Sequence, residues 1–294
     1  MKPRTAFWCA CAIWVLSLGM MITALTYNHV HLLPAGQQGS AADGVAGVAF
    51  ITGFATVGAL LVWKRPGHPI GWLLSASGLA YATAVFGLLL WHVPGARAWV
   101  HWFGWIWLFS LGLAVLVVLL FPNGRLPSRR WRPVAWAATA GLAGWVLGNA
   151  FAPKIVTADT PMPNPIGVPA PAGNVFVILA IGGAVLIVGT LLAAIVSVVF
   201  RYRRAGTVER EQLKWLIYAG ALIVVALLAE LVVEKIMGPG NASTNLQNAL
   251  STGAVALIPV AIGIAIFRYR LYDIDVVINK TLVYGLLAAF ITAV

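Results

Sequence analysis

The sequence predicts an all-α fold, a polytopic integral membrane bundle of eight full transmembrane helices plus a truncated ninth, with a cytoplasmic N-terminus. Composition is the first reason: 61% of the 294 residues are hydrophobic and only 9% are charged, whereas a soluble domain carries about 25% charged residues. The second reason is that the apolar residues form runs of about 20 residues, the length that a helix needs to cross a membrane. The third is the distribution of Lys and Arg between these runs.

The apolar runs define the predicted spans of a single membrane module over residues 1–294. The first run follows Lys2 and Arg4 and is longer than the apolar region of a cleaved signal peptide, so we expect it to remain as a span. The last run is too short to cross a membrane, which predicts further membrane helix and a cytoplasmic effector domain beyond Val294. The runs cover residues 6–27, 44–63, 70–91, 99–121, 134–151, 174–200, 215–237, 250–267 and 281–294.

The basic residues predict the orientation. If the N-terminus is inside, the outer connections receive only Arg97, Lys154 and Lys235, and the inner side receives the other 16 of the 19 Lys and Arg residues. Cytoplasmic loops are enriched in Lys and Arg, so this alternation indicates a multi-pass protein of a cell membrane. The net charge of +11 then predicts contact with anionic lipid headgroups rather than with nucleic acid.

Proline and glycine mark turns, a kink and a close helix contact. Residues 122–124 (Pro-Asn-Gly) follow the fourth run and predict a turn with a positive φ. Pro259 lies inside the eighth run and predicts a kink. Gly144 and Gly148 form a GxxxG pattern, which permits close helix approach either within the bundle or in a dimer.

Two longer connections are predicted on the outer side. Residues 152–173 contain six prolines, which disfavour a regular helix or a central strand, so we expect an extended external loop. Residues 238–249 are polar and are predicted to form a second outer loop before the eighth span.

Glu230 is a candidate sensing residue. It lies in the seventh run, where a carboxylate is costly and therefore often functional. We hypothesise that it faces the bundle interior and contributes to stimulus detection. The alternative is a residue near the outer interface that is hydrated or paired with Lys235.

His101 and Trp102 are candidates in an aromatic stretch at the outer end of the fourth run. Trp102 shares one helix face with Trp99 and Trp105, and His101 lies off that face. These tryptophans could form a wall for an extracellular ligand, or an aromatic belt that packs helices at the interface. His101 also belongs to a scattered set of outer histidines that could sense a metal or protons.

No P-loop, dinucleotide-binding, zinc-protease or serine-hydrolase motif occurs in the sequence, so we expect no catalytic, cofactor-binding or metal-binding residue in this chain. Asp273 and Asp275 match a metal-binding DxD pattern, but pairing with Arg268 and Arg270 or capping of the short helix is the favoured interpretation. Residues 271–279 have the spacing of a short amphipathic helix. We expect these charged residues to anchor it at the inner surface and couple it to the last span.

Several inner segments resemble the membrane regions of actinobacterial sensor histidine kinases. The similar segments are 68–74 (HPIGWLL), 121–127 (FPNGRLP) with 131–133 (WRP), 212–215 (QLKW) and, as the most specific, 267–284 (FRYRLYDIDVVINKTLVY). Together the similarity covers roughly residues 60–290, and the outer loops and first span do not add to it.

The resemblance implies the sensory module of a two-component signal transduction protein in a bacterial plasma membrane. The parent protein would be a homodimer that autophosphorylates a histidine from ATP, with Mg²⁺, and passes the phosphoryl group to a response regulator. Neither the phosphoacceptor histidine nor the ATP-binding motifs lie within residues 1–294, and His68 matches a helix-start motif, so no catalytic residue is carried over. The alternatives are a membrane module of another effector, such as a phosphatase, a small-molecule transporter, or an integral membrane enzyme.

Overall fold

The computed structural model describes residues 3–30, 41–155, 162–238 and 240–268. Its α-helices are α1 (Pro3–Val30), α2 (Ala41–Lys64), α3 (Pro69–Gly87), α4 (Arg97–Gly104), α5 (Ile106–Leu120), α6 (Arg132–Phe151), α7 (Asn174–Arg204), α8 (Thr207–Met237), α9 (Asn241–Val255) and α10 (Leu257–Arg268). Short elements are the 3-10 helices η1 (Leu88–His92) and η2 (Arg129–Trp131) and the strands β1 (Lys154–Ile155) and β2 (Met162–Pro163).

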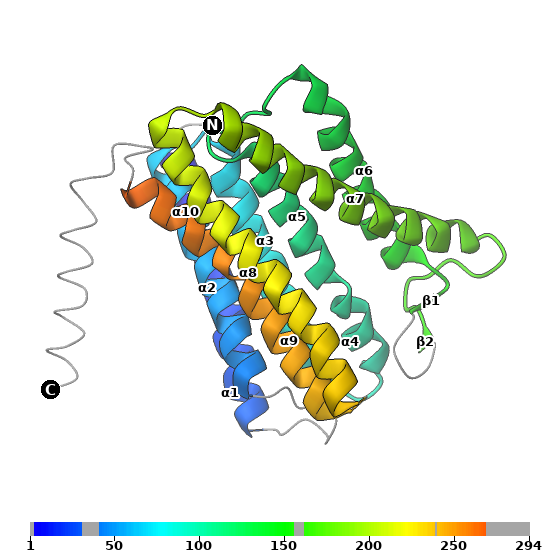
Figure 1. Ribbon diagram of the computed structural model, residues 1–294. Coiled ribbons are helices and arrows are strands. Elements are labelled where there is room, and N and C mark those ends of the chain that lie inside the picture. Colours follow the sequence, from blue (N-terminus) through cyan, green and yellow to red (C-terminus); the bar gives the residue numbers. More distant parts are fainter. Residues whose placement is uncertain (1–2, 31–40, 156–161, 239, 269–294) are drawn as a thin grey trace, which may run out of the picture.

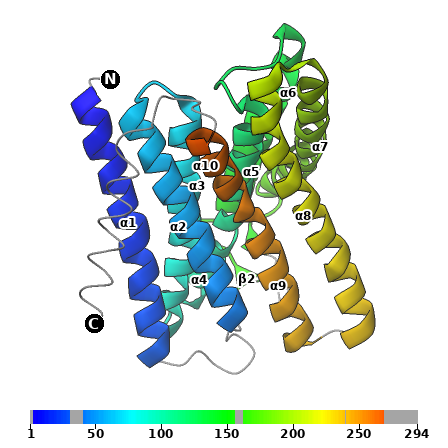
Figure 2. The same cartoon turned by 60° about the vertical axis from the view of Figure 1, so that its left-hand side comes forward.

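The all-α membrane architecture is confirmed for the first eight spans. Within the described residues, eight helical segments are long and apolar enough to cross a membrane, and each overlaps a predicted run. The predicted ninth span, 281–294, lies outside the described residues. Figures 1 and 2 show that successive spans alternate in direction, so the start of α1 and the α2–α3, α5–α6 and α7–α8 connections share one end of the bundle.

This end, hereafter the basic end, gathers the positive charge. Three basic residues, Arg97, Lys154 and Lys235, lie toward the connections at the opposite end. The described basic residues of the three connections at the basic end are Lys64, Arg65, Arg125, Arg129, Arg130, Arg132, Arg201, Arg203, Arg204, Arg210 and Lys214. The alternation inferred from charge is therefore the alternation of the fold.

Two spans are interrupted helices. The eighth span breaks at Ala256 between α9 and α10, which confirms the expected kink, because the Pro259 ring excludes the carbonyl four residues earlier. Gly53 of α2 lies beside this break, and a Cβ added there would be 3.2 Å from Pro259 Cγ. The fourth span breaks at Trp105, between α4 and α5, a feature that the sequence did not predict.

The main core joins helices that are far apart in the chain. Phe54 of α2, Leu74 of α3, Leu119 of α5, Leu213 of α8 and Ile262 of α10 are fully buried in one cluster. In lipid, helices associate through van der Waals packing rather than through a hydrophobic driving force. The contacts among these buried side chains therefore position the helices.

Helices α6 and α7 are antiparallel and pack closely against each other (Figure 1). Glycines in both helices permit this close approach. A Cβ on Gly148 would meet the backbone of Ala180, including its Cα at 2.6 Å, and a Cβ on Gly183 would lie 2.7 Å from the Gly141 carbonyl oxygen. Gly144 lies on the same face, with its Cβ position 3.1 Å from the Leu179 oxygen. The GxxxG pattern thus serves packing within the bundle.

The predicted outer loop at 238–249 is wrong for residues 241–249, which form the first half of α9. These residues are polar but satisfy their hydrogen bonds through helical neighbours: Ser243 Oγ donates to the Gly240 carbonyl at 2.8 Å, and Gln247 Nε2 donates to the Glu230 carbonyl of α8 at 3.2 Å. A polar helical turn packed on α8 and α2 has the composition of a loop, and only its tertiary contacts identify it.

The proline-rich connection forms a short antiparallel ribbon, β1 with β2. Asn164 follows this ribbon and is buried. Its Nδ2 donates to the carbonyls of Ala150 at 3.0 Å and Ala152 at 2.8 Å, which closes the end of α6. In the described part of this connection no helix forms, as its prolines predict.

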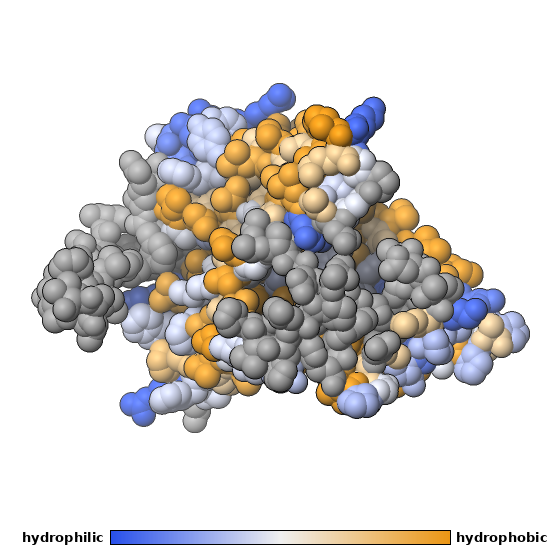
Figure 3. Space-filling model, turned by 90° about the horizontal axis from the view of Figure 1, so that it is seen from below, coloured by the Kyte–Doolittle hydropathy of each residue, from blue (hydrophilic) through white to orange (hydrophobic). Residues whose placement is uncertain are grey.

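Large aliphatic side chains cover the outside of the bundle. Ile178 and Val185 of α7 and Leu228 and Ile236 of α8 are exposed, as are most of their apolar neighbours on these two helices. Figure 3 shows hydrophobic residues reaching the molecular surface, with hydrophilic residues at its rim. A contiguous apolar surface of this kind fits contact with lipid.

Two adjacent glycines of α7 offer a matched test of the α6–α7 contact. Gly183→Ala should destabilise the protein by about 1–3 kcal/mol because the added methyl group meets the α6 backbone. Gly182→Ala should be neutral or slightly stabilising, because no atom lies within 4 Å of its Cβ position. Thermal unfolding in detergent measures both; equal effects of the two substitutions would contradict the described packing.

Candidate functional site

The candidate site is the layer of connections at the basic end. The turn after α5 lies against the start of α3: Gly124 has φ of +68°, as the Asn-Gly sequence predicts, and a Cβ there would be 2.9 Å from His68 Nε2 and 3.0 Å from Pro69 Cδ. Phe121 is buried in the main core beneath this turn. Glycine is therefore required at position 124 both by its backbone conformation and by the close approach of α3.

The start of α3 is fixed from both sides. Trp72 Nε1 donates to the Pro66 carbonyl at 2.9 Å, which ties the first turn of the helix to the preceding connection. Gly71 lets α3 approach α2 closely, since its Cβ position lies 3.0 Å from the Val62 nitrogen. Ile70 is buried in the main core. Ile70, Gly71 and Trp72 therefore each have a packing or positioning role.

His68 connects this helix start to the turn after α5. It precedes the α3 span, is partly buried and hydrogen-bonds to the backbone of Asn123. Burial lowers the pKa of the His68 imidazole below its usual value of 6.5, and the positive charge of Arg65 lowers it further, against the opposing effect of the Asn123 hydrogen bond. The neutral imidazole is therefore the form that this packing favours.

Arg201 connects α7 to α5. Its side chain is buried, and its guanidinium group donates to the Leu119 carbonyl and, at 3.1 Å, to Ser197 Oγ. Leu119 lies in the last turn of α5, where carbonyl groups have no partner within the helix. Arg201 therefore supplies a donor to the end of a neighbouring span.

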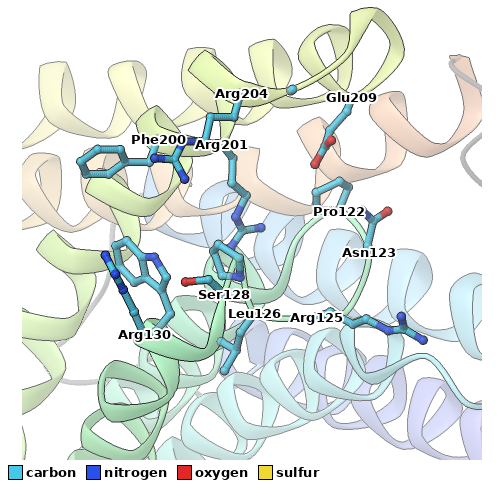
Figure 4. Close-up of a pocket in the computed structure, with 13 residues that line it drawn as sticks. Pro122, Asn123, Arg125, Leu126, Ser128, Arg130, Phe200, Arg201, Arg204 and Glu209 are labelled. Atoms are coloured by element: carbon cyan, nitrogen blue, oxygen red, sulfur yellow. The ribbon is translucent and has the colours of Figure 1, made fainter.

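A cavity of about 630 Å³ lies between the α5–α6 connection and the α7–α8 corner. Figure 4 shows Arg201 reaching from α7 toward Ser128, with Glu209 on the side of Pro122. Its lining is Pro122, Asn123, Arg125, Leu126, Pro127, Ser128, Arg130, Trp131, Phe200, Arg201, Arg204, Ala205 and Glu209. Four arginines and one carboxylate make it a cationic cavity.

The tryptophans at the end opposite the basic end form an array of ring contacts. The ring centroids of Trp99 and Trp102 are 5.7 Å apart and those of Trp102 and Trp105 are 5.5 Å apart, both edge to face. Trp102 Nε1 donates to the Ala150 carbonyl of α6 at 3.4 Å, and Trp145 Nε1 donates to the Trp105 carbonyl at 3.3 Å. These contacts give the array a packing role, and binding of an extracellular ligand stays a prediction.

Glu230 is partly buried and lies on the side of α8 that contacts α9. Its carboxyl group hydrogen-bonds to Ser251 of α9, and its Oε1 is buried without a partner among the described residues. Among the described residues, Glu230 and Lys235 form no ion pair, since the salt bridge that occurs there joins Lys214 to Glu211. Its role in sensing stays a prediction.

The other predicted site residues are described only in part. His101 lies in α4 and Arg268 ends α10, but their side chains are outside the described set. Arg270, Asp273, Asp275 and the predicted surface helix 271–279 lie outside the described residues. Among the described residues, no group of His, Cys, Asp and Glu is arranged to hold a metal ion.

Comparison with protein-family models, with curated proteins and with solved structures gives no match. The resemblance to sensor histidine kinases therefore stays an expectation that rests on the short segments themselves.

Sequence reasoning missed the cationic cavity and the role of Arg201. The sequence places Arg201 and Arg204 among the inner-side basic residues and predicts an Arg and Tyr anchor at headgroup level, whereas the Arg201 side chain is buried. The repeated Phe-Arg-Tyr-Arg sequence at 200–203 and 267–270 was the available signal. It marks the end of a span, but the sequence does not reveal that the first arginine points inward.

The lowered pKa of His68 predicts loss of stability in acid. Above pH 6.5 the imidazole is neutral in both the folded and the unfolded chain; as pH falls below that value the unfolded chain binds the proton first, so stability decreases until the folded pKa is passed. Thermal unfolding followed from about pH 7.5 to about pH 5 should show this decrease, and His68→Gln should reduce it. His92→Gln, at the other end of the same span, is the control and should keep the decrease. An unchanged pH profile in His68→Gln would refute the assignment.

Proposed function

We propose that this bundle is the membrane sensory module of a signalling protein, with a cytoplasmic ATP-dependent histidine kinase as its effector. The supporting observation is that the similar segments, far apart in the chain, pack together: Ile70 and Leu74 of the first, Phe121 of the second and Leu213 of the third belong to one buried cluster. If these segments transmit a conformational signal together, they are expected to contact one another, and this packing supports that role.

The layer suits transmission of a conformational signal. Arg201 ties α7 to the end of α5, and His68 ties the start of α3 to the same connection. A rearrangement of the spans would therefore move these connections together rather than one at a time. α10 contributes Ile262 to the same cluster and leads toward residue 268, after which the most specific similar segment continues.

The stimulus would act at the opposite end. Glu230, Ser251 and Gln247 place polar groups between α8 and α9, and α9 continues into α10 across the break near Pro259. A change in hydration or protonation between α8 and α9 would alter this pair, and the broken helix would carry the change toward the basic end. The tryptophan array is the second candidate surface.

The proposal includes the orientation and partners that the sequence implies. The basic end would face the cytoplasm of a bacterial cell and contact anionic headgroups. The signalling unit would be a homodimer, and a response regulator would receive the phosphoryl group from the effector. ATP and Mg²⁺ would belong to that effector rather than to this bundle.

The main alternative from another class, a small-molecule transporter, is less well supported. A transporter places polar groups around a site near the middle of the membrane. Here Ser77 and Ser110 donate to each other's backbone carbonyls, the second at 2.7 Å, and so bind α3 to α5. A second described cavity is almost wholly apolar, lined by Ala76, Leu79, Ala80, Thr83, Trp105, Ile106, Phe109 and Val146. An effector such as a phosphatase remains the alternative within signalling.

The first step of the test is to sequence the complete open reading frame that encodes this chain. The second is to incubate membranes that contain the full-length protein with radiolabelled ATP and to measure its phosphorylation. The proposal expects acid-labile phosphohistidine on this protein. It fails if the frame encodes no effector, or if a phosphatase or a completed bundle without soluble domain is found.

A pair of variants then tests sensing by Glu230. Glu230→Gln should change basal labelling by about fivefold, the effect of about 1 kcal/mol on a two-state equilibrium. Glu234→Gln, one helical turn away and exposed, should leave it unchanged. Equal labelling in both variants would remove Glu230 from the mechanism without affecting the kinase assignment.

A further inference from the structure

The cationic cavity at the basic end is built from two separate parts of the chain. Arg125 and Arg130 come from the connection between α5 and α6, and Arg201 and Arg204 come from the last turn of α7. Its volume of about 630 Å³ lies in the range of sites for small molecules, roughly 300–1,000 Å³. The cavity therefore has room for a group of headgroup size.

The described residues offset the positive charge in this cavity only in part. Its lining holds four arginines and the single carboxylate of Glu209. Among the described residues the ion pair that forms joins Lys214 to Glu211, and neither residue lines the cavity. Arginines that line one cavity create a positive potential in it, which favours entry of an anion.

Arg201 supplies a second, independent observation. It is only 9% exposed, and its Nε is buried with no hydrogen-bond partner among the described residues. A buried donor without an acceptor is costly, about 1–3 kcal/mol. The planar donor group of arginine matches the oxygens of a phosphate, so guanidinium groups that line the cavity suit such a ligand.

The remaining lining indicates an ester rather than a bare ion. Trp131, Leu126 and Phe200 place apolar and aromatic surface beside the arginines. Phe200 is half exposed, and Val196 and Val199 continue its exposed apolar surface along α7. A phospholipid could place its phosphodiester among the arginines and its acyl chains along α7.

We propose that this cavity is a binding site for a phosphate ester, recognised by Arg125, Arg130, Arg201 and Arg204. A phospholipid headgroup and a soluble phosphorylated molecule share this chemistry, and the acyl-compatible surface of α7 favours the lipid. The assignment does not depend on the signalling function. Glu209, on the rim, opposes the anion and reduces its affinity.

The experiment compares two double variants of the full chain. Arg130→Gln with Arg204→Gln removes two exposed cavity arginines, and Arg129→Gln with Arg203→Gln removes their exposed sequence neighbours, which do not line the cavity. Both lose the same charge, and neither touches buried Arg201. Retention of phosphatidylglycerol is measured by native mass spectrometry after extraction from nanodiscs of phosphatidylcholine and phosphatidylglycerol. Binding of inorganic pyrophosphate is measured by calorimetry in uncharged detergent.

The expected result is that wild type and the neighbour variant retain phosphatidylglycerol, whereas the cavity variant binds it about tenfold more weakly or worse. Glu209→Gln should bind it more tightly. The same pattern with pyrophosphate alone would assign a soluble phosphate ligand to the site. Equal losses in the two double variants would show a general effect of surface charge and overturn the proposal, as would no binding of either probe by the wild type.

Discussion

Within a hydrocarbon layer a backbone carbonyl can accept a hydrogen bond only from the protein, so every helix end or break near that layer needs a donor. Several described side chains in this bundle meet that requirement. Arg201 donates to α5, Asn164 to the end of α6, and Trp145 and Trp102 to carbonyls at Trp105 and Ala150. The polar side chains near the helix ends and breaks thus supply hydrogen bonds to carbonyl groups that lack a partner within their own helix.

Glycine sets how closely the helices can approach, and that distance decides which donors reach which carbonyls. The α6–α7 pair is held through Gly148 and Gly183, and α7 then brings Arg201 beside the end of α5. At the other pair, Gly71 brings α3 against α2 and thereby holds His68 over the turn at Gly124. Packing in the middle of the bundle therefore controls the geometry of its basic end.

The basic end combines mechanical connection with a local excess of charge. Its connections are short and joined through Arg201 and His68, so under the proposed function they would move as a unit. Among the described residues, Arg130 and Arg204 form no ion pair, and both line a cavity beside buried Arg201. A membrane module that reads a stimulus and a site that holds an anionic phosphate are compatible uses of this layer, since a bound phosphate would further join α7 to the α5–α6 connection.

The amino-acid sequence alone determined the number, order and alternation of the eight described spans. These features depend on the length of each apolar run and on the positions of Lys and Arg, which are properties of the sequence itself. It also determined the turn at Gly124 and the break before Pro259, which follow from local backbone chemistry. It misassigned residues 241–249 as a loop, since polar residues become helical there through contacts with α8. Only the tertiary structure decided that Arg201 turns inward and that arginines 76 residues apart, Arg125 and Arg201, line one cavity. Such proximity depends on packing between helices, and no local pattern encodes it.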